Sequence, residues 1–133
     1  MALTVVDAGV VIAVLDAADS HHAASVDAVR RAIASGESLV LPVSAYAEVL
    51  VAPFRRNLES AAVVDSFIDA LPATVQPITR EVARMAAQLR AQHGPRLRLP
   101  DALVVATALE LSADRLLTTD KRWPDVGLKL ETA

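Results

Sequence analysis

Short apolar runs alternate with longer helical stretches along the whole chain, and this alternation constrains the fold more than any other feature. The strand-like runs are residues 3–6 ("LTVV"), 38–41 ("SLVL"), 73–78 ("ATVQPI"), 114–120 ("DRLLTTD") and, as a final edge strand, 127–131 ("GLKLE"). Helices are expected over residues 9–15, 20–34, 42–53, 58–70, 79–93 and 101–111. Helical crossovers allow neighbouring strands to run parallel, with helices on both faces of the sheet. The sequence therefore predicts an α/β fold, a three-layer α/β/α domain with a central, mainly parallel sheet.

Residues at the ends of these segments support the assignment. Asp19 and Ser20 are suited to cap the second helix, and Thr79 to cap the helix that ends near His93. Pro77 places the third strand at a sheet edge or marks its end, because proline cannot donate a ladder hydrogen bond. A length of 133 residues fits one domain, residues 1–133.

Composition limits the chemistry that this domain can perform. The chain has no cysteine, which excludes disulfides, thiolate metal sites and cysteine nucleophiles and leaves oxygen and imidazole as metal ligands. Its net charge of −3 argues against indiscriminate nucleic-acid binding. Arginines nevertheless gather over residues 80–98, and this group is either a solvated helix face or a contact for RNA: Arg80, Arg84, Arg90, Arg96 and Arg98. Neither a secretion signal nor a membrane span is evident, so a cytoplasmic location is expected.

Asp7 lies in the middle of an apolar run, "LTVVDAGVVIAVL". An ionised carboxylate in such surroundings costs several kcal/mol unless it is paired. Asp7 follows the first strand and Asp120 follows the fourth, so both are expected at the carboxyl edge of the sheet, where α/β proteins bind ligands. A helix after the second strand carries Glu48, and Asp101 begins a helix that is apolar on nearly every side.

Each of these acids except Asp7 has a structural explanation when it is taken alone. Asp101 suits a helix N-terminus, Glu48 a solvated helix and Asp120 an Asx turn. Together they form one predicted site, because the topology brings all four to the same edge. Charges about 5 Å apart repel by roughly 3 kcal/mol per pair at an effective dielectric constant near 20, so a cation is expected among them. Carboxylate oxygens favour Mg²⁺ or Mn²⁺ over zinc, which indicates phosphoryl chemistry.

Four segments that contain these acids resemble the acidic motifs of PIN-domain ribonucleases: "VVDAGVVIAVL", "AYAEVL", "LPDALVVATALEL" and "LLTTDKRWP". The likeness covers residues 3–124, and the short chain resembles the VapC toxins of VapBC toxin–antitoxin pairs. The resemblance implies that Asp7, Glu48, Asp101 and Asp120 are the family's acidic quartet. Thr118 matches the threonine of its Thr-x-Asp motif.

The hypothesis is then a metal-dependent endoribonuclease acting on tRNA, rRNA or mRNA. Asp7 and Asp101 bind Mg²⁺ most directly, and Asp120 and Glu48 act through water or a second ion. Thr118 or Thr119 orients a carboxylate or the attacking water. The resemblance also implies a homodimer and a VapB-type antitoxin in a groove near the acids, which Tyr46 and Phe54 are suited to line.

Other functions remain open on the sequence alone. A haloacid dehalogenase-like phosphatase also places an aspartate after its first strand, but position 9, where it carries a second acid, is glycine here. A receiver domain needs an acid pair before its acceptor, and none precedes Asp7. A non-catalytic binding module with the PIN fold is the third alternative. The three histidines are assigned no chemistry: His21, His22 and His93.

Overall fold

The computed structural model describes residues 2–133, which form one five-stranded sheet in the order β3-β2-β1-β4-β5. Every neighbouring pair of strands is parallel. The strands are β1 (Leu3–Val6), β2 (Ser38–Pro42), β3 (Ala73–Gln76), β4 (Arg115–Thr118) and β5 (Leu130–Thr132). β1 is mostly β-branched and three of its four residues are buried, as expected for a strand at the centre of the sheet, between β2 and β4.

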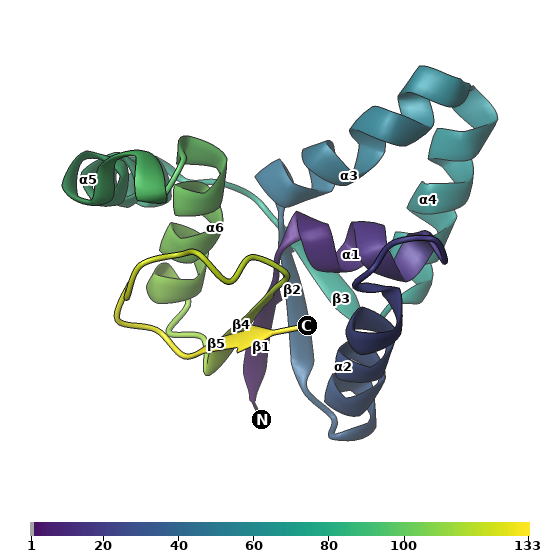
Figure 1. The fold of residues 1–133 in the computed structure, drawn as a ribbon, viewed down its shortest axis with the longest axis horizontal. Helices are drawn as coiled ribbons and strands as arrows, with labels where there is room; N and C mark the ends of the chain where they lie inside the picture. Colours follow the sequence, from purple (N-terminus) through teal and green to yellow (C-terminus); the bar gives the residue numbers. More distant parts are fainter. Residues whose placement is uncertain (1) are drawn as a thin grey trace.

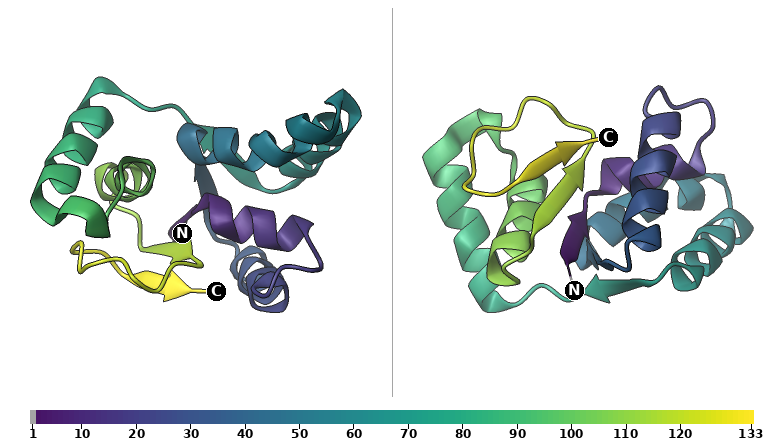
Figure 2. Two further views of the ribbon diagram at one scale, coloured as in Figure 1. Left: turned by 45° about the horizontal axis from the view of Figure 1, so that its top comes forward. Right: turned by 90° about the horizontal axis from the view of Figure 1, so that it is seen from below.

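Helices cover both faces of this sheet (Figures 1 and 2). The helices are α1 (Ala8–Leu15), α2 (His22–Ala34), α3 (Val43–Arg56), α4 (Leu58–Ala70), α5 (Arg80–His93) and α6 (Leu99–Glu110), with a short 3₁₀ turn, η1 (Gly94–Arg96). Helices α1, α2 and α4 lie on one face, whereas α6 lies on the other with α5 packed outside it. The predicted three-layer α/β/α fold is therefore confirmed.

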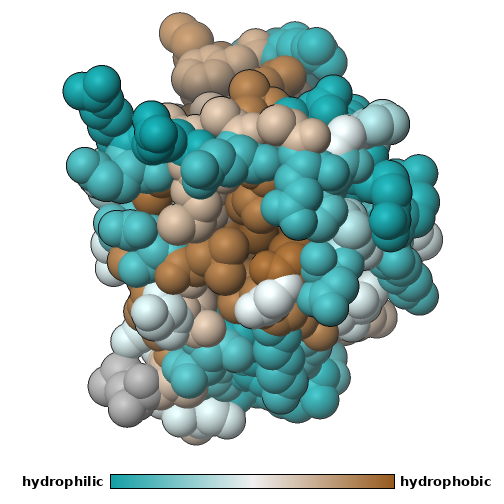
Figure 3. Space-filling model, turned by 90° about the vertical axis from the view of Figure 1, so that its left-hand side faces the viewer, coloured by the Kyte–Doolittle hydropathy of each residue, from teal (hydrophilic) through white to brown (hydrophobic). Residues whose placement is uncertain are grey.

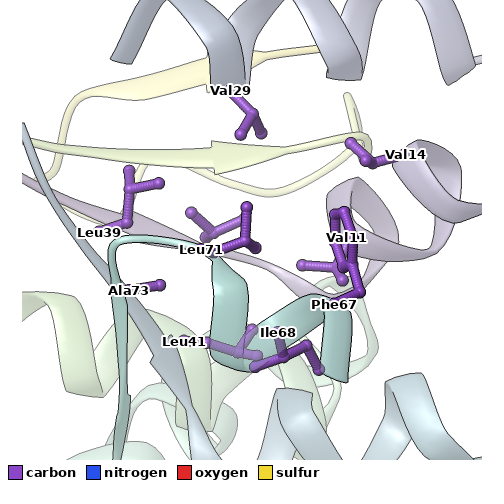
Figure 4. Close-up of a pocket in the computed structure, with 10 residues that line it drawn as sticks. Val11, Val14, Val29, Leu39, Leu41, Phe67, Ile68, Leu71 and Ala73 are labelled. Carbon is purple, nitrogen blue, oxygen red and sulfur yellow. The ribbon is translucent and has the colours of Figure 1, made fainter. Parts of the chain in front are cut away.

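The apolar core extends through both helical layers. On the α6 side it includes Val104 and Val105, which confirms that this helix is central and buried. On the other side, side chains of α1, α2, α4, β2 and β3 enclose a small apolar hollow of about 30 Å³, into which Phe67 and Leu71 point (Figure 4). None of the helices in residues 2–133 is long and apolar enough to cross a membrane.

Several element ends differ from the sequence-based prediction, each for a local reason. β3 ends at Gln76 because Pro77 has no N–H to donate. β5 begins only at Leu130, because a turn at Gly127, with φ at +73°, precedes it. α3 continues through Pro53 to Arg56, since proline removes one backbone hydrogen bond but its φ suits a helix.

The second helix also starts slightly later than expected, at His22. Asp19 accepts a hydrogen bond from the backbone N–H of His21 at 2.8 Å, so it closes the turn before the helix and is not the N-cap residue. The cap predicted at Thr79 is confirmed: its side chain accepts from the N–H of Val82 at 3.1 Å.

Candidate functional site

The strand order reverses beside β1. Strands β2 and β3 are added on one side of β1, and strands β4 and β5 on the other side. In an open parallel sheet, the crevice beyond the carboxyl ends at such a point is the usual binding site. Val6 pairs with Leu117 across β1 and β4, so the next residue of each strand, Asp7 and Thr118, meet at this edge. The register alone places these two side chains together.

Asp7 links the strand to the following helix. It is the N-cap of α1, and its Oδ1 accepts a hydrogen bond from the backbone N–H of Ala8 at 2.8 Å. Its Oδ2 accepts from the hydroxyl of Thr118 at 3.0 Å. Asp7 is only 9% exposed, and these two contacts fix its carboxylate in one orientation.

Thr118 also determines where Asp120 lies. The Thr118 hydroxyl oxygen accepts from the backbone N–H of Asp120 at 3.1 Å, and Asp120 accepts from the N–H of Arg122 at 2.8 Å. These successive turns end β4 at Thr118, two residues before the end predicted from "DRLLTTD". Asp120 is therefore in an Asx turn beyond the strand, still at the carboxyl edge.

The other two acids come from helices at the same edge. Glu48 is on α3, one residue before the buried Val49, so it borders the core-facing side of that helix and is itself exposed. Asp101 is in the first turn of α6, where the backbone N–H groups favour a negative charge.

The four acids are linked electrostatically, because the charge of at least one other acid raises the pKa of Asp7, of Glu48 and of Asp101. Burial raises the pKa of Asp7 to about 6, the Thr118 and Ala8 hydrogen bonds oppose this rise, and the charges of Asp101 and Glu48 add to it. Burial and then the charge of Asp101 raise the pKa of Glu48. Burial also raises the pKa of Asp101, against the lowering effect of Arg98 and together with the charge of Asp120.

This donor set fits a hydrated divalent cation better than a metal enclosed by protein. Within residues 2–133, Asp7 has no lysine or arginine in an ion pair, so its buried charge is uncompensated. The same residues contain no group of three or more acidic or histidine side chains arranged to hold a metal ion. Mg²⁺ is commonly held by one or two carboxylates and completes its shell with water and phosphate oxygens, which agrees with this open arrangement.

Three residues that the sequence did not single out for this site border it. The indole N–H of Trp123 faces Asp101 and lowers its pKa, yet Trp123 Nε1 is buried without a hydrogen bond of good geometry. Ser44 precedes Glu48 by one helical turn, and its buried hydroxyl also has no partner in the described residues. Arg122 joins Arg98 beside Asp101 and Asp120. Trp123 and Arg122 reach the site through the loop after β4, and Ser44 through the start of α3. These positions have no distinct sequence pattern.

Thr119 lies against the first turn of α1. A Cβ atom placed on Gly9 would lie 2.5 Å from Thr119 Oγ1, so a larger residue here would force the Thr119 hydroxyl to move. A role for Thr119 in orienting water stays a prediction.

A groove of about 330 Å³ opens beside Glu48, between α1, α3 and α4. Its apolar lining includes Ile12, Ala52 and Val63. Tyr46 and Phe54, which the sequence suggested as lining residues, do not line this groove: the Tyr46 hydroxyl donates to Asp65 and ties α3 to α4, and Phe54 is 54% exposed elsewhere on α3.

Two histidines have structural contacts. A ring nitrogen of His21 lies 3.1 Å from the Ala133 carbonyl, and one of His22 lies 2.7 Å from the Ala13 carbonyl. These contacts join α2 to the chain end and to α1.

Solved structures with similar folds come from toxin–antitoxin systems. A Rickettsia felis VapBC2 complex bound to a promoter DNA fragment aligns with a TM-score of 0.73 and 14% identity, covering 98% of each chain. A Klebsiella pneumoniae toxin–antitoxin complex gives 0.71 and 18%, covering 99% of this chain and 97% of that one. Mycobacterium tuberculosis VapC20, a toxin that cleaves the sarcin–ricin loop, gives 0.69 and 18%, covering 85% and 86%.

At these identities the likeness establishes the fold, and the family rests on the sequence itself. No curated protein matches the chain. The sequence profile of the PIN domain, however, matches residues 4–129, nearly the whole chain and all four acids. The chain therefore belongs to the PIN domain family.

Proposed function

We propose that this protein is a metal-dependent endoribonuclease and the toxin of a toxin–antitoxin pair. The observation that carries the proposal is the buried Asp7 carboxylate, held by Thr118 and Ala8 without a cationic partner and within the field of the other acids. Membership of the PIN family and the fold shared with VapC structures support the same assignment.

In this proposal Asp7 and Asp101 bind Mg²⁺ or Mn²⁺ directly, and Asp120 and Glu48 act through water or a second ion. When bound, such an ion lowers the pKa of a coordinated water and stabilises charge on the phosphoryl oxygens. Thr118 keeps the Asp7 carboxylate turned toward the crevice and positions Asp120 through its backbone N–H. The indole N–H of the buried Trp123 favours the charged form of Asp101, the form that binds a cation.

The reaction is hydrolysis of an RNA phosphodiester. Water forms a bond to phosphorus, the bond from phosphorus to the 3′ oxygen breaks, and the products carry a 5′-phosphate and a 3′-hydroxyl. Since carboxylates act as proton acceptors here, no histidine is required.

RNA cleavage by purified protein tests this proposal. The wild type should cleave structured RNA in the presence of Mg²⁺ or Mn²⁺, and cleavage should stop when a chelator is added. Asp101→Asn should abolish cleavage, whereas Asp125→Asn, which changes an exposed carboxylate in the loop before β5, should not. The 5′ ends of RNA sequenced after brief expression should differ between the wild type and Asp101→Asn. Equal cleavage by wild type and Asp101→Asn would reveal a contaminating nuclease and refute the proposal.

The partner proposal is a VapB-type antitoxin whose peptide occupies the groove beside Glu48. The apolar lining of that groove, from three helices, fits an apolar peptide side that would block access to the acids. Val63→Glu should weaken inhibition by the antitoxin without reducing cleavage, because Val63 is exposed and belongs to α4. Unchanged inhibition would place the antitoxin elsewhere.

A homodimer is also proposed. The side of the molecule that carries α5 shows an apolar strip between hydrophilic surroundings, which suits a contact between two copies (Figure 3). Light scattering coupled to size exclusion should give twice the chain mass of 14.1 kDa. A monomer at micromolar concentration would contradict it.

A further inference from the structure

A second hollow lies beside the acidic site, on the side of Asp101 and Asp120. It has a volume of about 400 Å³ and is lined by residues of η1, the start of α6 and the loop after β4: Pro95, Arg96, Arg98, Asp101, Asp120 and Arg122. Three guanidinium groups thus share one pocket with two of the four acids. Arg122 lies within the PIN-like segment "LLTTDKRWP", whereas Arg96 and Arg98 lie outside all four of these segments.

Two of these arginines are held by the acids only loosely. Arg98 Nε lies 3.9 Å from Asp101 Oδ2, and Arg122 Nε lies 3.4 Å from Asp120 Oδ1. Strong guanidinium–carboxylate hydrogen bonds are shorter, at about 2.7–2.9 Å. The side chains of Arg98 and Arg122 are 78% and 89% exposed, so these ion pairs contribute little to stability and leave both arginines free to turn.

The pocket has the chemistry of a phosphate site. Guanidinium groups bind phosphate oxygens through paired N–H donors. Three of them, two from the junction of η1 and α6 and one from the loop after β4, line a space large enough for a nucleotide phosphate and its sugar. A divalent ion on Asp101 or Asp120 would repel the neighbouring guanidinium groups, whereas a phosphate would attract them. The same arginines can therefore neutralise the acids in the free protein and contact phosphate in the complex.

We propose that Arg96, Arg98 and Arg122 bind an RNA phosphate next to the one that is cleaved, and that Arg98 and Arg122 exchange their carboxylate partners for it. This inference rests on the proposed nuclease function. It adds that the bound RNA strand extends from the acids toward the side of Asp101 and Asp120. It also divides the basic group of residues 80–98. Arg96 and Arg98 line the pocket, whereas Arg80, Arg84 and Arg90 are on α5 and outside it.

RNA binding by arginine variants tests the exchange. A labelled single-stranded RNA is titrated with wild type, Arg98→Ala, Arg122→Ala and the double variant in EDTA, which stops metal-dependent hydrolysis, over a series of salt concentrations. Each lost phosphate contact should make the negative slope of log affinity against log salt less steep by about 0.7. Arg84→Ala is the matched control, since Arg84 is an exposed arginine on α5. Circular dichroism checks that all variants are folded.

Kinetics and ion binding supply two further readouts. With Mg²⁺, the double variant should raise KM by about tenfold and change kcat less, because the arginines bind a phosphate that does not react. Mn²⁺ titration of RNA-free protein, followed by fluorescence of the single tryptophan beside Asp101, should show tighter ion binding in Arg98→Ala, because a competing cation has been removed. Opposite changes in RNA and ion affinity would not result from a disrupted fold.

The outcomes separate this inference from the proposed function. If wild type cleaves RNA but the arginine variants match Arg84→Ala in affinity, salt slope and KM, the arginine assignment is wrong and the nuclease stands. If RNA binds through these arginines without being cleaved, the nuclease is wrong and the phosphate site stands. If no RNA binds, or if RNA and ion affinity fall together in Arg98→Ala, the exchange is refuted.

Discussion

Replacing Asp7 by asparagine should stabilise the metal-free protein. The substitution keeps the shape of the side chain and both of its contacts. The amide oxygen can accept the N–H of Ala8, since asparagine is a good N-cap, and the amide nitrogen can donate to the Thr118 hydroxyl oxygen. What the substitution removes is the negative charge that burial disfavours.

The magnitude follows from the pKa of Asp7, which burial raises from 3.8 to about 6. This difference corresponds to ~3 kcal/mol. Because the folded protein binds the proton more tightly than the unfolded chain, ionised Asp7 lowers stability above pH 6. The penalty disappears as the pH falls from about 6 to below about 4, where the carboxyl group is protonated in both states. Asp7→Asn should therefore raise the free energy of unfolding by up to ~3 kcal/mol at pH 8, or the Tm by roughly 10 °C, and have little effect at pH 4.

Thermal and urea unfolding in EDTA between pH 4 and pH 8 measure this effect. Asp125→Asn is the control, because Asp125 is exposed and accepts the backbone N–H of Gly127 at 2.9 Å. Its effect should stay within about 0.5 kcal/mol. Destabilisation by Asp7→Asn at pH 8, or a gain that does not depend on pH, would show that Asp7 is a structural residue and refute the reasoning.

Three further perturbations test other parts of the account. Mg²⁺ affinity, measured by calorimetry, should fall about tenfold per pH unit below pH 6, because Asp7 must lose its proton to bind the ion; constant affinity between pH 5 and 7 would contradict this. Gly9→Ala should lower stability by about 1–2 kcal/mol through the contact with Thr119, and Thr119→Ala should restore it; additive effects in this double-mutant cycle would exclude the contact. Arg115→Met should cost roughly 2–4 kcal/mol in urea unfolding, since it leaves the largely buried Glu37 carboxylate unpaired; a neutral effect would mean that Glu37 is solvated.

The fold and the positions of the acids could be predicted because they depend on strong local signals. Apolar β-branched runs between amphipathic segments require a parallel sheet, and an acid directly after such a run lies at its carboxyl edge. Asp7 satisfies both conditions, and its resemblance to the PIN motif agrees with them. The predicted helix of residues 101–111 was correct in type because its apolar side chains extend around the whole helix.

The remaining features depend on contacts between distant segments. Nothing in "TTDKRW" shows that the Thr118 hydroxyl binds two partners, that β4 stops there, or that Arg122 turns toward the acids. Pro53 suggested a helix end, but its φ is compatible with a helix, and α3 continues to Arg56. Nothing in the sequence distinguishes Trp123 from a core residue, and only its position beside Asp101 connects it with the site.

The most direct measurement is the anomalous signal of Mn²⁺ in crystals of wild type and of Asp7→Asn. The account predicts a Mn²⁺ ion within coordination distance of the Asp7 and Asp101 carboxylates, with water between the ion and Glu48 or Asp120, and loss or weakening of this ion in Asp7→Asn. A protein saturated with Mn²⁺ that shows no ion between Asp7 and Asp101, or one bound equally well without the Asp7 charge, would contradict the account.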